Sequence, residues 1–299
     1  MRISIVTPTV DDAPFLDEAI SSVPYWKQGE VEHIVVHDGS AAFALALQTR
    51  HRHLKLVKGP GRGATAAVAD GIALATGDFV LQLNSDDRLF PTAFDSLFAA
   101  ATRWPEVGIW TGGTRIFTID GSGREIIIRH IQSPEATKFS LLRLFDDIPL
   151  IPARFIHRSV FSKIGSLDQR FLESSDREFM IRAFINGVTE GPLDVLVSAI
   201  RLHLQSRTTH RRPRWVPPYL AEHLRIADMW LVSSTLAPEK KRSFRSWRAR
   251  EVLRLAVYQL LAHQWAAAAR TVSQESTVDP LWWCRAPSIF GALSRRRQS

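Results

Sequence analysis

The chain has 299 residues, of which 45% are hydrophobic, and its single cysteine, Cys284, excludes a disulfide framework and a cysteine-based zinc site. Its net charge of +8 is uneven, because residues 1–200 hold 20 Lys and Arg against 24 Asp and Glu, whereas residues 201–299 hold 18 against six. It opens on a strand-like segment and holds no run of about 18 apolar residues, so we expect a folded, cytoplasmic protein with neither a signal peptide nor a membrane span.

Apolar, β-branched segments alternate with helix-like segments over the first part of the chain. Buried strands are predicted at residues 3–9, 33–38, 54–59 and 79–84. Helices are predicted between them at residues 15–23 and 64–75. The repeated order of strand, helix and strand predicts an α/β fold with a parallel sheet flanked by helices. Ligands of such sheets bind at the carboxyl ends of the strands.

Two adjacent acids, Asp86 and Asp87, follow the predicted strand at 79–84, after Asn84 and Ser85. Carboxylates side by side repel each other unless a cation or a proton shares the site. Oxygen ligands without a neighbouring His or Cys favour Mg²⁺ or Mn²⁺, and such an ion keeps coordination positions for phosphate oxygens. The acid pair therefore predicts a site for a metal-bound diphosphate.

A purely structural interpretation of the acid pair is also open. The two acids would cap the next turn, and Asp87 would pair with Arg88 or Arg62. The other strand ends favour a binding site, because Asp38-Gly39-Ser40 closes the second predicted strand and Thr7-Pro8-Thr9 closes the first. Three polar strand ends at one edge of a sheet are harder to explain by capping than any one of them.

After residue 91 the pattern changes to a longer strand and hairpin. Residues 107–130 predict this hairpin, with its turn at Asp120-Gly121-Ser122-Gly123, so the sheet is expected to become mixed. Residues 207–219 are rich in Arg and Pro and predict a loop, and residues 220–269 predict helices interrupted at Pro238.

We therefore expect a domain boundary near residue 210. Residues 1–210 would form the α/β domain, and residues 211–299 a basic, Trp-rich helical extension. Six of the nine tryptophans lie in this extension. Trp beside Arg suits an anionic membrane interface, whereas a helical core of Trp with a solvated basic face is an equally open interpretation. Nucleic acid is not expected as a partner, because the sequence lacks the local nucleic-acid motifs.

Five segments follow one another in the order "ISIVTPTVDD", "FLDEAISSV", "HIVVHDGS", "GRGATAAVADGIALATGDFVLQLNSDDRLFP" and "IPARFIHRSVFSKIGSLDQRFLESSDREFMIRAF". Together they resemble the GT-A-fold glycosyltransferases of family 2 over residues 1–206. The resemblance implies a Rossmann-like, mostly parallel mixed sheet flanked by helices. It also implies an enzyme that transfers a sugar from a nucleotide diphosphate sugar.

The resemblance further implies roles for the residues at the strand ends. The segment "LNSDD" is similar to the variant DxD motif, so Asp86 would bind Mg²⁺ or Mn²⁺ and the diphosphate. Asn84 would lie near the ribose, Asp87 would support the loop, and Asp38 would bind the nucleoside. The other residues implied around the nucleotide sugar are Thr7, Pro8, Thr9, Gly63 and Ser85.

Sugar transfer with inversion needs a carboxylate that removes the proton of the acceptor hydroxyl. The segment "ESSDREF" is similar to the base motif of the family, which implies Asp176 as the base and Glu173 as an acceptor-binding or supporting residue. The local pattern alone fits another interpretation, in which Asp176 only caps the helix that follows.

His203 is implied as a further metal ligand, with Ser206 and Arg207 touching phosphate, although a surface histidine fits the sequence equally well. The chain departs from the family at Asn84, where Asp is usual, and this removes one charge from the expected metal site. This departure leaves an inactive, transferase-like scaffold at a membrane as an alternative.

A second alternative comes from Gly59-x-Gly61-x-x-Ala64 between a predicted strand and a helix, which matches the dinucleotide fingerprint of NAD-linked enzymes. That fingerprint normally follows the first strand of its unit, and here it follows the third. The sequence therefore favours an inverting, metal-dependent glycosyltransferase that acts on a glycan or lipid-linked acceptor in polysaccharide assembly. We expect it in the cytoplasm, with peripheral contact at the inner face of the membrane.

Overall fold

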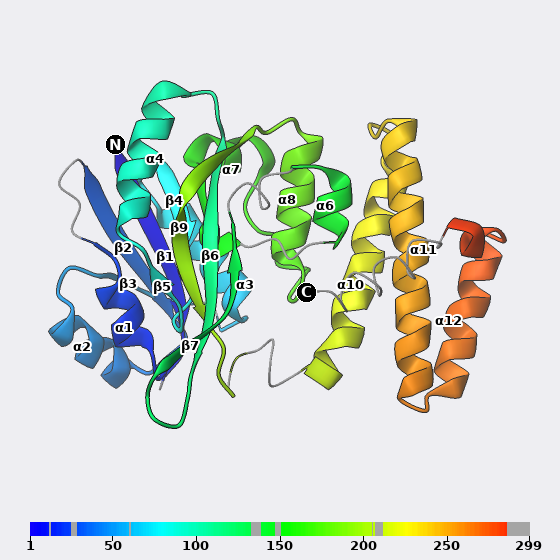
Figure 1. Cartoon of the computed structure of the whole chain (residues 1–299), viewed down its shortest axis with the longest axis horizontal. Helices are drawn as coiled ribbons and strands as arrows, with labels where there is room; N and C mark the ends of the chain where they lie inside the picture. The colour runs from blue at the N-terminus through cyan, green and yellow to red at the C-terminus, as the bar shows by residue number, and fades with distance from the viewer. Residues whose placement is uncertain are drawn as a thin grey trace. The chain divides into compact units, whose positions relative to one another are not determined.

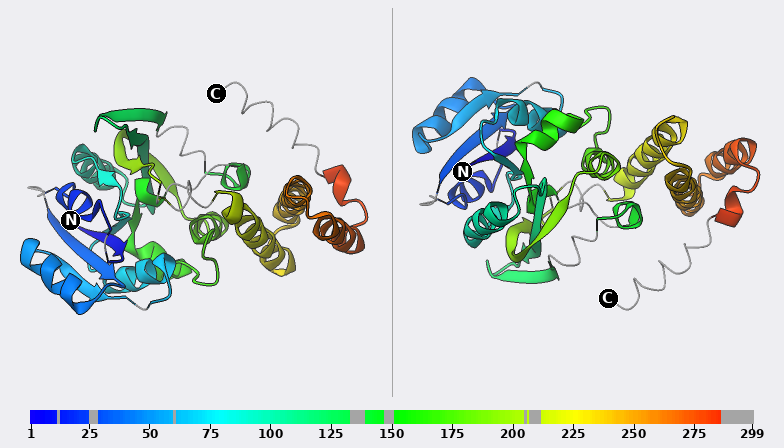
Figure 2. Two further views of the ribbon diagram at one scale, coloured as in Figure 1. Left: turned by 90° about the horizontal axis from the view of Figure 1, so that it is seen from below. Right: turned by 90° about the horizontal axis from the view of Figure 1, so that it is seen from above.

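A computed structural model describes residues 1–11, 13–24, 29–59, 61–132, 139–146, 151–204, 206 and 212–285, with side chains from residue 218 onward in the last range. The chain divides into two compact units, Met1–His210 and Arg211–Ser299. The first unit is an α/β domain with a mixed, mostly parallel sheet between helices, as predicted (Figure 1, Figure 2).

The first half of this sheet consists of parallel strands in the order β3-β2-β1-β4. The strands are β1 (Arg2–Thr9), β2 (Glu30–His37), β3 (Lys55–Lys58) and β4 (Phe79–Gln82). The helices between them are α1 (Leu16–Ser21), α2 (Ala41–Arg50) and α3 (Ala64–Leu74). The predicted strands and the predictions of α1 and α3 are confirmed, whereas α2 was not predicted. Ser40 caps α2 by accepting a hydrogen bond from the Phe43 backbone N–H at 3.1 Å.

The second half of the sheet is mixed, as predicted. Its strands are β5 (Arg88–Leu89), β6 (Ile109–Ile119), β7 (Glu125–Ile131), β8 (Arg154–His157) and β9 (Glu190–Arg201). The helices are α4 (Thr92–Arg103), α6 (Leu141–Asp146), η1 (Ile151–Ala153), α7 (Arg158–Ile164) and α8 (Ser175–Ile185). Strand β8 runs antiparallel to β4 and β6, while β6 and β9 are parallel. The β6–β7 hairpin turns at Asp120, whose carboxylate accepts the backbone N–H groups of Ser122 and Arg124.

The core of the α/β unit lies between the sheet and its helices, where apolar side chains of β1, β4, β8 and α4 are fully buried. Close packing is visible at Gly71 of α3, where a Cβ atom would lie 2.4 Å from Val6 Cγ1. Helix α3 therefore approaches β1 too closely for any residue larger than glycine at position 71. This close packing fixes the loop that precedes α3 relative to the ends of the strands.

A buried histidine in β2 gives the α/β unit a pH-dependent stability. His33 is 3% exposed, and burial lowers its pKa to about 3. Between pH 6.5 and pH 3 the unfolded state binds a proton at this residue and the folded state does not. The contribution of His33 to the free energy of unfolding is therefore fully present above pH 6.5 and is lost as the pH falls. We expect the free energy of unfolding to fall by about 2 kcal/mol between pH 7 and pH 5 from this residue alone.

Denaturant unfolding at the two pH values measures this change. His33→Gln is the matched variant, because its amide can keep the hydrogen bond between His33 Nε2 and Thr7 Oγ1 (2.9 Å) but does not titrate. The variant should lose less stability on acidification than the natural chain. Equal losses in the two proteins would contradict the prediction.

The second unit consists of α10 (Arg212–Val232), α11 (Pro238–Leu261), α12 (Trp265–Val278) and η2 (Trp282–Arg285). The helices predicted over 220–269, with an interruption at Pro238, are confirmed, because α10 ends at Val232 and α11 begins at Pro238. The loop predicted over 207–219 is wrong from Arg212 onward, where α10 begins, and residues 207–211 lie outside the described residues. Proline is tolerated in the first helical turn, so Pro213 does not prevent the helix. Among the described residues, no helix is both long and apolar enough to cross a membrane.

A buried polar group lies in the centre of this helical unit. Glu251 Oε2 lies 3.1 Å from His223 Nδ1, and Arg254 donates to the same carboxylate at 2.8 Å. Burial opposes ionisation, but His223, Arg254 and Arg250 outweigh it and lower the pKa of Glu251 to about 2. The tryptophans fit both earlier interpretations in part, because Trp247 and Trp282 are buried whereas Trp265 and Trp283 are exposed.

Candidate active site

The carboxyl ends of the parallel strands lie together at one edge of the sheet. Thr9 at the end of β1 is paired with His37 at the end of β2, and His37 is paired with Lys58 at the end of β3. Strand β4 ends three residues earlier in the register, where Gln82 is paired with Val6, and the chain continues toward the same edge because the Leu83 N–H donates to the Val6 carbonyl at 2.9 Å. The polar residues that follow these strands are therefore neighbours at one edge, at the lower end of the sheet in Figure 1.

The two acids after β4 have different surroundings. Asp87 is 2% exposed and accepts hydrogen bonds from Asn84 Nδ2 (2.9 Å) and the Arg201 backbone N–H (3.0 Å). Burial and the neighbouring charge of Asp86 raise the pKa of Asp87 to about 8. Asp86 is more open, and its Oδ2 lies 3.0 Å from His203 Nε2. Asp87 therefore holds the turn, and Asp86 presents its carboxylate together with an imidazole.

The salt bridges considered for Asp87 in the structural interpretation are not the ones that form. Arg88 pairs with Glu18 at 3.3 Å and with Glu125. Arg62 donates to Gln169 Oε1 at 2.8 Å. The carboxylate of Asp87 is held by an amide and by a backbone N–H instead.

Arg201, at the end of β9, organises this part of the site and was not predicted. Its Nε donates to the Asp86 carbonyl at 3.2 Å, and its guanidinium binds Glu18 at 2.5 Å and lies 4.2 Å from the centre of the Phe15 ring. The same Phe15 ring makes a T-shaped contact with the His203 ring, with 5.0 Å between centroids. Arg201 therefore links the Asp86 turn to the segment that carries His203.

Ser206, which the resemblance implied near phosphate, is 5% exposed and shapes the turn at His203. Its hydroxyl accepts the His203 N–H at 3.0 Å and donates to the Arg201 carbonyl at 3.3 Å. Arg207, the other residue expected near phosphate, lies outside the described residues. The short turn after β9 thus fixes the imidazole beside Asp86.

The donor set at Asp86 fits a hard divalent ion that keeps most of its coordination positions for other ligands. A carboxylate and an imidazole whose polar atoms lie 3.0 Å apart can both reach one ion. No group of three or more His, Cys, Asp and Glu side chains arranged for a metal occurs in the described part of the chain. An ion here would therefore depend on oxygens of a bound phosphate or of water.

Asp38 lies against the loop that leads into α3. Its Oδ1 accepts the Gly61 N–H at 2.9 Å, and a Cβ atom at Gly59 would lie 2.4 Å from the same oxygen. Gly61 and Gly63 adopt positive φ angles of 67° and 89°, and Gly63 is the N-cap of α3. The glycines that suggested a dinucleotide fingerprint thus shape a loop around Asp38.

A second contact joins the loops after β1 and β2. Both carboxylate oxygens of Asp11 accept the Ser40 N–H, at 3.0 and 3.1 Å, and the Asp38 N–H donates to the Thr9 carbonyl at 3.0 Å. Asp11 therefore holds the loop beside Asp38.

Several residues that were implied around the nucleotide sugar are buried or half-buried, and most of their side chains make contacts within the domain. Thr7 is fully buried, and its hydroxyl is bound to His33. Pro8 and Thr9 are buried, and the Thr9 hydroxyl donates to the Val10 carbonyl at 3.2 Å. Asn84 accepts from Gln82 Nε2 at 2.8 Å in addition to its bond to Asp87. Ser85 is half-buried in the same turn.

Asp176 is the second residue of α8 and is half-buried, as is Glu173 in the preceding turn. Asp176 Oδ1 accepts the Arg177 N–H at 2.7 Å. The start of α8 lies against the start of α3, because Thr65 Oγ1 and Ser175 Oγ are 3.3 Å apart. Asp176 therefore stands beside the same loop that holds Asp38.

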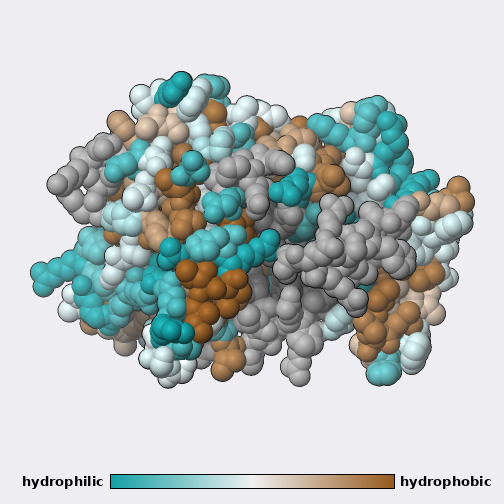
Figure 3. Space-filling model, in the orientation of Figure 1, coloured by the Kyte–Doolittle hydropathy of each residue, from teal (hydrophilic) through white to brown (hydrophobic). Residues whose placement is uncertain are grey.

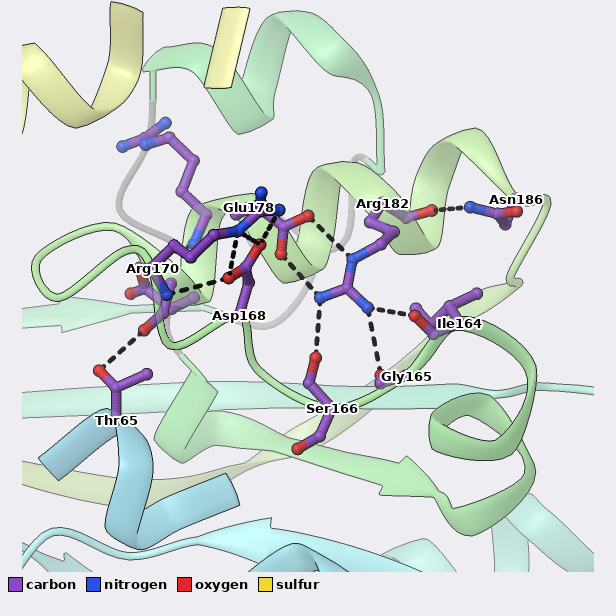
Figure 4. A network of polar contacts seen from close by, with 12 residues as sticks. Thr65, Ile164, Gly165, Ser166, Asp168, Arg170, Glu178, Arg182 and Asn186 are labelled. Carbon is purple, nitrogen blue, oxygen red and sulfur yellow. Dashed lines mark hydrogen bonds and ion pairs between the residues drawn. The ribbon is translucent and has the colours of Figure 1, made fainter. Parts of the chain in front are cut away.

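Helix α8 is fixed to the segment before it (Figure 4). Arg182 binds Glu178 at 2.7 and 2.8 Å and donates to the carbonyls of Ser166 (2.8 Å) and Gly165 (3.2 Å). The buried Arg177 donates to the Leu144 carbonyl. Both arginines thus brace the helix that presents Asp176.

A model of glycosyl transferase family 2 matches residues 4–165, which is more than half of the chain. The chain belongs to glycosyltransferase family 2. It is therefore a nucleotide-sugar glycosyltransferase with a GT-A fold, and the interpretation as an NAD-linked enzyme is wrong.

Individual relatives agree with this family. The chain is 26% identical over 190 residues to the uncharacterized glycosyltransferase Rv1514c of Mycobacterium tuberculosis, covering 60% of this chain and 68% of that protein. TarS 1–349 of S. aureus, in complex with UDP-GlcNAc, superposes with a TM-score of 0.64 at 18% identity, covering 90% of this chain and 79% of TarS 1–349. The mannosyltransferase PcManGT of Pyrobaculum calidifontis, in complex with GDP-Man and Mn²⁺, gives a TM-score of 0.56 at 16% identity, with coverages of 98% and 86%.

Proposed function

We propose that this family 2 enzyme transfers a sugar with inversion to a hydroxyl group of a glycan or lipid-linked acceptor. The contact between Asp86 and His203 at the carboxyl edge of the sheet is the observation that carries the proposal. TarS with UDP-GlcNAc and PcManGT with GDP-Man support a nucleotide diphosphate sugar as the donor.

Asp38 would accept hydrogen bonds from the nucleoside of the donor, because its carboxylate is half-buried among the loops after β1, β2 and β3. Gly63 leaves the backbone at the start of α3 uncovered by a side chain. The side chains of Thr7, Asn84 and Asp87 would act indirectly, by keeping the strand ends and the Asp86 turn in position.

Asp86 and His203 would hold Mn²⁺ or Mg²⁺, and PcManGT with Mn²⁺ supports this assignment. When bound, the ion would neutralise the charge that develops on the departing diphosphate. Asp87 and Arg201 keep the two ligands adjacent, since they bind each other and the backbone of the same turn.

Asp176 would accept the proton of the acceptor hydroxyl as that oxygen attacks the anomeric carbon. Its place in the first turn of α8 suits this role, because the helix is braced by Arg177 and Arg182. Glu173, in the turn before α8, would lie on the acceptor side.

Ligand-induced thermal stabilisation tests the donor and metal assignment directly. A UDP or GDP sugar at about 100 times its dissociation constant should raise the melting temperature by about 5 °C, and only when Mn²⁺ or Mg²⁺ is present. NADH and AMP serve as controls and should have no effect. Stabilisation by NADH, or by no nucleotide sugar at all, would contradict the proposal.

We also propose that the helical unit contacts an anionic membrane. At the turn between α11 and α12, Leu260, Leu261 and Trp265 are exposed, with values of 40%, 77% and 63%. Exposed Trp and Leu on a basic unit suit the interface of a bilayer rich in acidic lipid. Such contact would keep the enzyme at the inner face of the membrane, close to a lipid-linked acceptor.

Flotation with liposomes of phosphatidylcholine and phosphatidylglycerol measures this contact. The double variant Leu261→Glu/Trp265→Glu should float at least about tenfold less than the natural chain. The control Val232→Glu changes an 83% exposed residue at the end of α10 and should float normally. Equal flotation of the double variant, or no flotation of the natural chain, would reject the membrane contact.

A further inference from the structure

Arg201 is a buried cation beside the candidate active site. Its side chain is 4% exposed, and its guanidinium lies 4.2 Å from the centre of the Phe15 ring and 4.8 Å from the centre of the Phe117 ring. Water has little access to a guanidinium in these surroundings. Its charge therefore has to be balanced by a carboxylate of the protein.

Glu18, in the first turn of α1, supplies this carboxylate. Its Oε2 accepts a hydrogen bond from Arg201 Nη2 at 2.5 Å, and its Oε1 lies 3.3 Å from Arg88 Nη1. In the part of the chain that the structure describes, Glu18 has the one carboxylate within 4.0 Å of the Arg201 guanidinium. The Glu18 side chain is 43% exposed, but the two guanidiniums hold both of its oxygens.

The neighbouring Arg88 depends less on Glu18. Arg88 also binds Glu125, which lies 3.6 Å from Arg115 as well. Glu125 is the first residue of β7, the strand that lies on the face where Figure 3 shows an apolar patch. When Glu18 is removed, Arg88 therefore keeps a carboxylate, whereas Arg201 keeps none among the described residues.

The charge of Arg201 matters because of its place on the Asp86 turn. Its Nε donates to the Asp86 carbonyl at 3.2 Å, and its backbone N–H donates to Asp87 at 3.0 Å. A positive charge fixed on the backbone of Asp86 repels a divalent ion at the carboxylate of the same residue. A carboxylate bound to the guanidinium offsets most of this repulsion.

We infer that Glu18 is a positioning residue for the metal site. Its carboxylate holds the Arg201 guanidinium on the Asp86 turn and neutralises it, so that Mn²⁺ or Mg²⁺ can bind at Asp86 and His203. Glu18 acts through Arg201 and is not itself a ligand of the ion. This role rests on the proposed function, because it requires an ion at Asp86. Loss of Glu18 should therefore weaken the affinity for the ion rather than slow the chemical step.

Electron paramagnetic resonance of free Mn²⁺ measures binding to the full chain without turnover, in the presence of UDP or GDP and against a sample without protein. Glu18→Gln keeps the size of the side chain but removes its charge, and it should raise the Mn²⁺ dissociation constant about tenfold. Asp17→Asn is the matched control, because it removes a charge from the same helical turn but Asp17 pairs with His51 at 2.6 Å. This control should bind Mn²⁺ like the natural chain. Glu125→Gln leaves Arg201 paired and should raise the constant by less than about threefold.

A double-mutant cycle and a rate measurement separate this role from a general effect on folding. In an Arg201→Gln background, Glu18→Gln should change the Mn²⁺ dissociation constant by less than about twofold, because the cation that Glu18 neutralises is gone. Saturating Mn²⁺ should also restore kcat of Glu18→Gln to within about twofold of the natural value. Equal Mn²⁺ affinity of Glu18→Gln and the natural chain overturns the inference but leaves the proposed function intact, as does an equal loss with and without Arg201. A natural chain that binds no Mn²⁺ contradicts the metal assignment itself, and the role of Glu18 with it.

Discussion

Replacing Asp86 by asparagine should lower kcat/KM for sugar transfer by about 100- to 1,000-fold. The substitution preserves shape but removes the charge that faces His203 Nε2 at 3.0 Å. One ligand of the proposed ion is then neutral, and the departing diphosphate loses the cation that stabilises it. The variant should also need much more Mn²⁺ to reach half of its maximal rate.

Steady-state transfer with Mn²⁺ titration measures both effects. Asp194→Asn is the control, because Asp194 is an exposed acid on β9 outside the site, and its variant should match the natural chain. His203→Gln should raise the Mn²⁺ requirement with a smaller loss of rate, since the carboxylate remains. If Asp86→Asn keeps the natural Mn²⁺ response, the metal does not bind at Asp86.

The strand ends were predictable because they depend on local pattern. A buried strand that runs directly into Asn84, Ser85, Asp86 and Asp87 identifies the carboxyl edge of the sheet from the sequence alone. The different surroundings of the two acids were not predictable. Asp87 is buried by Arg201, which is 114 residues away in the chain, and no local signal distinguishes a buried arginine at a strand end from an exposed one.

Side-chain direction within the parallel strands was also beyond the sequence. Strands covered on both faces read as continuous apolar runs without alternation, so nothing indicated that Thr7 points toward His33. Helix α2 was missed because its apolar residues do not form a clear stripe, and a single Leu47 is buried. The start of α10 was missed because Arg- and Pro-rich segments usually form loops, whereas here the first proline lies in the first turn.

The contact between Asp86 and His203 illustrates the limit of local reasoning most clearly. The two residues are 117 positions apart, and His203 was implied only by the resemblance to the family, with a surface histidine equally open. The contact forms because the Phe15 ring, Arg201 and Ser206 together fix the turn after β9. Three separate segments of the chain must meet before this histidine can have a role.

Replacing Asp176 by asparagine should lower kcat by about 1,000-fold while leaving the affinity for the nucleotide sugar unchanged. An amide cannot accept the proton of the acceptor hydroxyl. Asparagine can still accept the Arg177 N–H that Asp176 Oδ1 accepts at 2.7 Å, so the start of α8 should stay intact. The substitution therefore separates the role of a base from that of a helix-stabilising residue.

Donor affinity by calorimetry, melting temperature and single-turnover transfer distinguish the possibilities. If Asp176 is the base, the Asp176→Asn variant should bind the donor with the natural affinity and melt within a few degrees of the natural chain. It should show almost no transfer. If Asp176 only stabilises the helix, Asp176→Asn should keep nearly full transfer, because the hydrogen bond to Arg177 is kept and a half-buried charge near a helix N-terminus contributes about 2 kcal/mol at most. Nearly full transfer would show that the base is another residue, for which the half-buried Glu173 in the preceding turn is the next candidate.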